Sequence, residues 1–198
     1  MKARNIIILL IASLSFSGCI VYSFYPLYAE KDLFANEILT GKWIDDEGAQ
    51  WNFEHDYFGN KVPENIDSSS YVLQIIDKDS LKSEFSVHVI KLGGNYFLDF
   101  YLEDFLDGQE LRLADFHIIP VHTFAKLTVK NNQLQINWFD QNWLEDLIKE
   151  NKIRIHHEKN DDFILLTAKP GELQKFVTKY VNSEEAFKEG MEAVLTRK

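Results

Sequence analysis

Cysteine is almost absent from this chain: Cys19 is the single cysteine among 198 residues. A lone thiol excludes an internal disulfide and a zinc site built on paired cysteines. The sequence also lacks a His-Glu-x-x-His motif, a Gly-x-Ser-x-Gly elbow and a glycine-rich phosphate loop. We therefore expect no metal ion, no cofactor, and no hydrolase built on a serine or cysteine nucleophile.

Basic residues are scarce too. The chain has 21 Lys and Arg against 31 Asp and Glu, which gives a net charge of −10. If residues 1–18 are removed as a signal peptide, Lys2 and Arg4 leave with them and the net charge becomes −12. An acidic surface without a basic stripe repels phosphate backbones, so nucleic acid is not an expected partner.

Long apolar runs are limited to the N-terminus. One run extends from residue 6 to Phe16, directly after Lys2 and Arg4. A helix that spans a bilayer needs about 20 apolar residues, so this shorter run has the layout of a secretory signal peptide. Residues 6–25 carry no charge, and an uncleaved N-terminal membrane anchor is the alternative interpretation, with simple secretion as a third.

The end of this run, Phe16-Ser17-Gly18-Cys19, resembles the lipobox of bacterial lipoproteins. The resemblance implies acyl chains on the Cys19 sulfur and cleavage before that residue. Several acyl chains anchor firmly, because each buried methylene contributes about 0.8 kcal/mol. Residues 20–23 contain no Asp, which by the same resemblance favours the outer membrane, with the domain facing the periplasm. The predicted organisation is a signal peptide at 1–18, the lipidated cysteine with a tether at 19–38, and one β-rich domain at 39–198.

Two hairpins have the clearest strand patterns. Gly93-Gly94 predicts a tight turn within residues 84–103, and Asn131-Asn132 predicts one within residues 121–139. Two-residue turns place only apolar residues on one face of each hairpin, which favours this register over a slipped one. The predicted pairs on these faces are Val89–Leu98, Val87–Phe100 and Phe85–Leu102 in the first hairpin, and Val129–Leu134, Leu127–Ile136 and Ala125–Trp138 in the second.

The rest of the pattern predicts a mainly β fold of the α+β kind, an antiparallel meander. Further strands are expected at 41–45, 49–55 and 71–77, with a last hairpin within 152–168. Helical spacing predicts a mid-chain helix at 140–151 and C-terminal helices at 169–181 and 182–195. Consecutive antiparallel strands of this number tend to close into a barrel or a strongly bent sheet, which hides their edges.

The segment Leu39-Thr40-Gly41-Lys42-Trp43 resembles the Gly-x-Trp start of the first strand in lipocalin-like barrels. The resemblance implies a closed barrel with Trp43 at its base and a helix after the last strand. Another antiparallel α+β fold is the alternative.

Two candidate sites follow from the predicted register. His88 faces Asp99 across two strands, which suits either a general base with its orienting acid or a plain cross-strand charge pair. The second candidate is an apolar pocket inside the sheet, able to take a small hydrophobic ligand. Its predicted lining is Trp43, Trp51, Val87, Val89, Leu98, Phe100, Leu127, Ile136 and Trp138.

Three functional hypotheses result. The leading one is a lipid-anchored, non-enzymatic envelope protein that binds a small hydrophobic ligand in this pocket. The first alternative is a structural or assembly lipoprotein that contacts another envelope protein and has no ligand cavity. The second alternative is a hydrolase that uses His88 and Asp99.

Replacement of the predicted lipidation site tests the anchor. We expect Cys19→Ser to abolish incorporation of labelled palmitate and to release the domain into the soluble fraction, because the sulfur that carries the acyl chains is gone. Palmitate labelling of whole cells, followed by fractionation, measures both effects. Continued labelling of the substituted chain would rule this assignment out.

Overall fold

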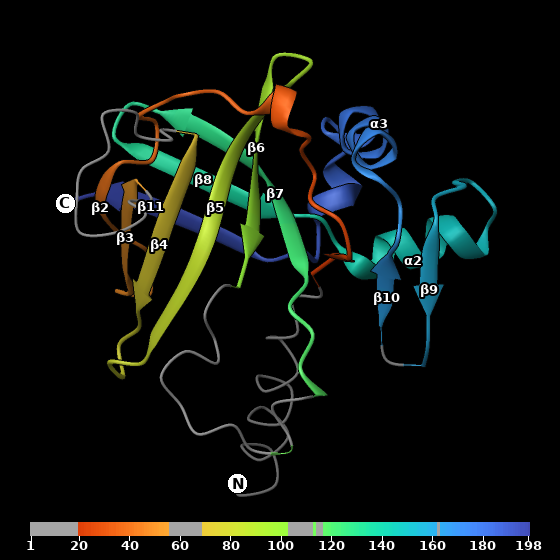
Figure 1. The fold of residues 1–198 in the computed structure, drawn as a ribbon, viewed down its shortest axis with the longest axis horizontal. Helices are drawn as coiled ribbons and strands as arrows, with labels where there is room; N and C mark the ends of the chain where they lie inside the picture. Colours follow the sequence, from red (N-terminus) through yellow and green to blue (C-terminus); the bar gives the residue numbers. More distant parts are fainter. Residues whose placement is uncertain (1–19, 56–68, 103–112, 114–116, 162) are drawn as a thin grey trace, which may run out of the picture.

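Eight antiparallel strands close into a barrel in the computed structural model, which describes residues 20–55, 69–102, 113, 117–161 and 163–198 (Figure 1). Each barrel strand pairs with the next in the chain, and the last pairs with both β8 and β2, which completes the ring. The antiparallel barrel expected from the sequence is therefore confirmed. Its strands are β2 (Gly41–Ile44), β3 (Gln50–His55), β4 (Ser70–Ile76), β5 (Lys82–Leu92), β6 (Asn95–Tyr101), β7 (His122–Lys130), β8 (Gln133–Trp138) and β11 (Glu192–Arg197).

A smaller layer stands beside the barrel, at the right of Figure 1. Strand β1 (Tyr22–Ser23) joins the two parts, because it pairs with the start of β7 and with β10. None of the helices among the described residues is long and apolar enough to cross a bilayer. The elements of this layer are β9 (His157–Lys159), β10 (Ile164–Leu166), α2 (Gln141–Lys149), α3 (Pro170–Tyr180) and the 3₁₀ turn η3 (Glu184–Phe187), while a second 3₁₀ turn, η1 (Glu30–Asp32), precedes the barrel.

Both predicted hairpins form in the predicted register. Val87 pairs with Phe100 and Val89 with Leu98 across β5 and β6, and the pairs of the β7–β8 hairpin are likewise as expected. The turns take the backbone conformations for which their residues are suited: φ is 55° at Gly93, 84° at Gly94 and 50° at Asn131. The left-handed region is accessible to glycine without strain and is tolerated by asparagine.

The chain differs from the prediction at residues 182–195. Instead of a second C-terminal helix, the 3₁₀ turn η3 is followed by strand β11. The edges of β2 and β8 need a partner, and β11 satisfies both while placing Ala193 and Leu195 in the interior. The predicted helices at 140–151 and 169–181 do form, as α2 and α3.

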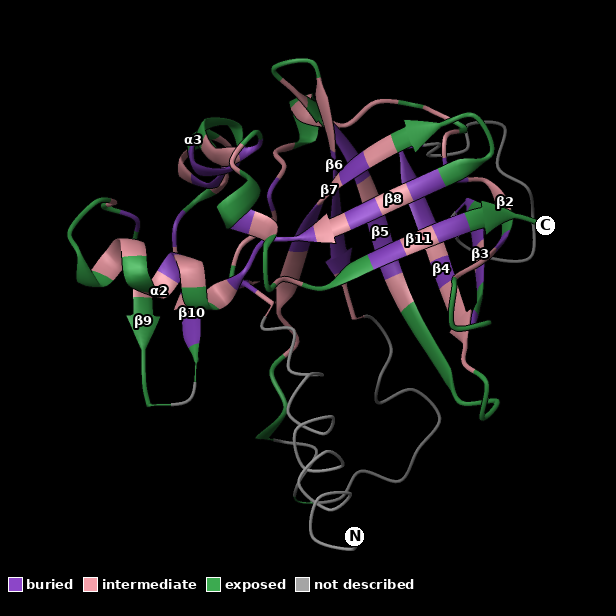
Figure 2. Cartoon of the chain, turned by 180° about the vertical axis from the view of Figure 1, so that it is seen from behind, coloured by how far each residue is buried: buried purple, intermediate pink, exposed green. Residues whose placement is uncertain are grey.

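Two hydrophobic cores result from this architecture. The first fills the barrel interior and the second lies between the outer face of the barrel and the side layer. The outward residues Ile90, Phe97 and Phe124 belong to the second core, where they share a cluster with Phe139 and Phe176. Seen from behind in Figure 2, buried positions alternate with less buried ones along β8 and β11, as expected for strands with one covered face.

Residues 20–38, expected to form a tether, include a segment packed on the barrel. Val21 and Leu27 are fully buried in the second core, and Ile20 forms a bridge with Asp140. The chain is therefore fixed to the domain from the first described residue.

The approach of η3 and β11 to β8 yields a test. A Cβ at Gly190 would lie 2.2 Å from the backbone oxygen of Trp138, so Gly190→Ala must displace the strand that closes the barrel. We expect a loss of about 1–3 kcal/mol in the free energy of unfolding, measured by urea denaturation. Gly171→Ala is the matched control, since its Cβ meets nothing within 4 Å; equal effects of the two substitutions would contradict the packing described.

Candidate functional site

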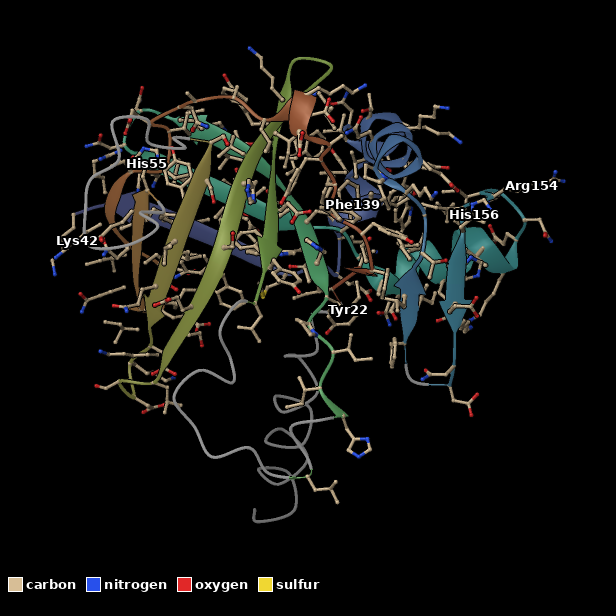
Figure 3. All side chains as sticks on the ribbon, in the orientation of Figure 1. Tyr22, Lys42, His55, Phe139, Arg154 and His156 are labelled. Carbon is tan, nitrogen blue, oxygen red and sulfur yellow. The ribbon has the colours of Figure 1, made fainter. Side chains whose placement is uncertain are left out.

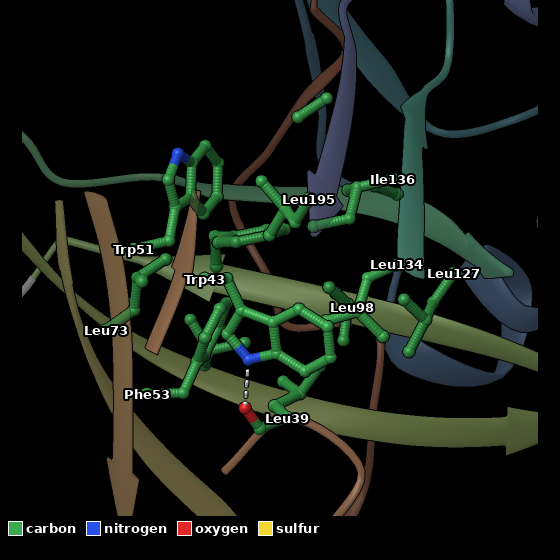
Figure 4. Close-up of a cluster of buried hydrophobic side chains, with 14 of the residues drawn as sticks. Leu39, Trp43, Trp51, Phe53, Leu73, Leu98, Leu127, Leu134, Ile136 and Leu195 are labelled. Carbon is green, nitrogen blue, oxygen red and sulfur yellow. Dashed lines mark hydrogen bonds between the residues drawn. The ribbon is translucent and has the colours of Figure 1, made fainter. Parts of the chain in front are cut away.

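The nine residues predicted to line a pocket all lie together inside the barrel. Every one belongs to the interior core, and none is more than 7% exposed. Figure 4 shows several of them with their neighbours Phe53, Leu73 and Leu195. The apolar face of the predicted hairpins is thus the interior of the closed sheet, except at Val129 near the end of β7, which is 44% exposed.

Side chains of the ring pack densely in the described part of the barrel interior. Phe53, Leu73, Leu98, Leu134 and Leu195 have no accessible surface, while Trp51 and Phe100 retain 7% and 5%. A cavity large enough for a ligand would leave part of its lining accessible, as protein interiors pack densely when no ligand space is built in. A barrel of eight strands is wide enough either to be filled by side chains or to hold one small ligand, so the packing of its interior decides between the two.

One end of the barrel is covered by the strap, residues 33–40, which runs into β2 (Figure 1). The Trp43 indole N–H donates to the Leu39 carbonyl at 2.7 Å, the bond drawn in Figure 4. The Arg197 guanidinium lies over the Trp43 ring, 4.3 Å from its centroid, and donates to the Thr40 carbonyl at 3.0 Å. The strap is therefore held to the first and last strands of the ring.

Polar groups fasten the same strap to β3 and β4. The Tyr71 hydroxyl donates to the Asn36 carbonyl at 2.5 Å, and His55 Nε2 lies 3.1 Å from a Glu37 carboxylate oxygen. A hydrogen bond donated by the Thr40 hydroxyl lowers the pKa of Glu37, and burial raises the pKa of Tyr71. These contacts keep the strap on the end of the barrel. They also pair Glu37 with His55, so that neither is a free acid or base.

The predicted His88–Asp99 register is confirmed, and the structure adds a partner that the sequence did not reveal. Asp99 is fully buried; one carboxylate oxygen lies 2.7 Å from His122 Nδ1 and the other accepts a 2.7 Å hydrogen bond from the Leu27 backbone N–H. The His88 ring lies against Tyr28, with centroids 4.3 Å apart. Pairing between β6 and β7 brings His122 to Asp99, and the register between these two hairpins was not predicted.

His122 and Asp99 are the residue types of an acid–base dyad, but their contacts here hold parts of the fold together. The His122 ring is largely buried and stacks on Tyr101, with centroids 4.6 Å apart. The second oxygen of Asp99 holds the N-terminal segment through Leu27. Among the residues that the structure describes, no group of three His, Cys, Asp or Glu side chains could hold a metal ion.

An apolar hollow of about 520 Å³ lies on the outer surface; we name it the β1–β10 groove. Tyr22, labelled in Figure 3, lines one side of this groove, on strand β1 between β7 and β10. Phe24 is 51% exposed and Ile119 is 71% exposed, which is unusual for such large apolar side chains. The sequence analysis did not predict this site, although the apolar residues Ile119, just before the second predicted hairpin, and Phe163, within the last one, were available as a signal. The lining residues are Tyr22, Phe24, His117, Ile119, Val121, Phe163 and Leu165.

The role of Asp99 can be tested by stability. Asp99→Ala leaves the buried Leu27 N–H and His122 without their acceptor, so we expect a loss of at least about 2 kcal/mol in the free energy of unfolding. His156→Ala is the matched control, since it breaks an exposed His–carboxylate pair with Glu172 and should cost less than about 1 kcal/mol. Urea unfolding measures both, and a small effect of Asp99→Ala would contradict a structural role for the pair.

No protein-family model, curated protein or solved structure matches this chain.

Proposed function

We propose that the chain is a lipid-anchored, non-enzymatic protein of the bacterial envelope whose filled barrel is a rigid scaffold that acts by contact with another envelope component. The observation that carries this proposal is the packing of the interior, where Phe53, Leu73, Leu98, Leu134 and Leu195 have no accessible surface. Exposed apolar side chains lie instead on the outer surface, in the β1–β10 groove.

The proposed anchor is supported by the lipobox resemblance at Cys19 and by the packing of the residues that follow it onto the domain. Ile20 bridges to Asp140, and Val21 is fully buried. Acyl chains on Cys19 would therefore join the domain at a fixed point of its surface. We place the protein in the outer membrane, facing the periplasm; an uncleaved N-terminal anchor would hold the same point of the domain at a membrane.

We also propose that the protein is not an enzyme. This proposal is supported by the Asp99–His122 pair, in which both Asp99 carboxylate oxygens and His122 Nδ1 are engaged by the protein itself. A general base needs a free nitrogen within reach of a substrate, and the largely buried, stacked ring of His122 offers little room for one. Retention of any detected turnover in His88→Ala would remove the predicted hydrolase.

A second candidate function keeps the predicted ligand inside the barrel. It is favoured by the wholly apolar interior of a closed eight-stranded ring, which is the architecture of known small-ligand barrels. Binding would require the strap at 33–40 to open and the core side chains to rearrange.

A fluorescence titration separates the two candidates. Trp143 lies in the outer core, so Trp143→Phe leaves Trp43, Trp51 and Trp138, all of the barrel interior, as the indole reporters. We expect a fatty-acid or retinoid probe to leave their emission unchanged, because a filled interior has no room for it. Saturable quenching in Trp143→Phe that is weakened by the additional substitution Trp138→Phe would contradict the scaffold and support the internal ligand.

A further inference from the structure

The β1–β10 groove is a surface feature that a filled scaffold leaves unexplained. Its lining residues come from three separate segments: the N-terminal strand β1 with the residue that follows it, the loop before β7, and β10 with the residue that precedes it. Phe24, Ile119 and Phe163 are all markedly exposed there, and Ile118, next to the groove, is exposed as well. Contiguous apolar surface of this kind on a soluble domain marks a place where something else binds.

The position of the groove in the chain indicates what binds there. Tyr22 lies three residues after Cys19, and three residues of extended chain span at most about 10 Å. If acyl chains are attached at Cys19, they enter the bilayer within that distance of the groove. The loop before β7 and the bend between β9 and β10 extend toward the same end of the molecule in Figures 1 and 2.

The chemistry of the lining suits lipid. Among the described residues that line the groove there is no Lys, Arg, Asp or Glu, and His117 is the one imidazole. Phe, Tyr and Ile side chains are those that enter the boundary between headgroups and acyl chains when a protein rests on a membrane. A protein partner at this place would have to enter between the domain and the bilayer that holds it.

We propose that the β1–β10 groove is a membrane-docking face, which inserts its exposed apolar side chains into the bilayer beside the lipid anchor; this rests on the proposed lipidation of Cys19. Docking fixes the orientation of the barrel as well as its location. Val129, near the far end of β7, is seven residues from His122, which places it about 23 Å away along the strand. The β7–β8 turn then points away from the membrane, toward the partner that the scaffold contacts.

Lipid quenching of an introduced tryptophan tests this orientation. Phe163→Trp places an indole in the groove, and Val129→Trp is the matched control, because the two native side chains are 43% and 44% exposed. The full lipidated chain is reconstituted into phosphatidylcholine vesicles with or without bromine on the acyl chains. Zwitterionic lipid is chosen because the protein is acidic.

We expect brominated lipid to reduce the added emission of Phe163→Trp roughly twofold and to leave Val129→Trp like the parent chain, since only a side chain in the acyl region meets the quencher. Adding Phe24→Asp and Ile119→Asp to Phe163→Trp should remove the quenching, because charged groups resist insertion. Equal quenching of the two tryptophan variants, or none in either, would overturn the docking face.

The same preparation separates the failure of docking from the failure of the anchor. A parent chain that does not float with the vesicles refutes the lipid anchor. A chain that floats while Phe163→Trp remains unquenched keeps its anchor and refutes docking. If Phe163→Trp is unquenched and the floated protein cross-links to itself through the groove, a second copy of the chain is the occupant and the proposal is wrong.

Discussion

Closure of the sheet by β11 is the constraint on which the rest of this structure depends. This strand forms antiparallel ladders with β8 on one side and β2 on the other, and it leaves no open edge in the ring. Open edges invite pairing with other chains, so closure also protects the domain from such pairing. With Ala193 and Leu195 facing inward, β11 completes the apolar interior.

Closure has a second effect, on the outside of the ring. The hairpin face opposite the interior carries Ile90, Phe97 and Phe124, which would be exposed on a bare barrel. The side layer and the N-terminal segment cover them, and the Asp99 carboxylate fixes that segment through the Leu27 backbone. The chain after Cys19 is consequently part of the packed domain, and any lipid at that cysteine bears directly on the orientation of the barrel.

The sequence predicted the parts of the fold that are decided locally. The turns at Gly93-Gly94 and Asn131-Asn132, the registers of both hairpins, and the helices α2 and α3 follow from alternation, helical spacing and turn chemistry. What it did not predict depends on contacts between distant segments. Strand β11 forms because two edges were vacant, although residues 182–195 alone favour a helix.

The candidate sites, too, have some features that are decided locally and others that depend on contacts between distant segments. The nine pocket residues were grouped correctly on one side of the sheet, because that grouping is a property of each hairpin and its neighbours. Whether they enclose space depends on how the strap and the opposite strands fill the ring, which no local pattern records. The Asp99–His122 contact and the β1–β10 groove likewise arise from the pairing of β6 with β7 and of β1 with β10.

Xenon under pressure can show whether side chains fill the interior of the ring. Xenon enters apolar cavities in protein interiors without requiring a polar partner or a specific shape. In crystals of the protein under xenon pressure, we expect no xenon among Trp43, Leu98 and Ile136. A well-occupied xenon peak between these side chains would contradict it and return the barrel to the class of internal ligand carriers.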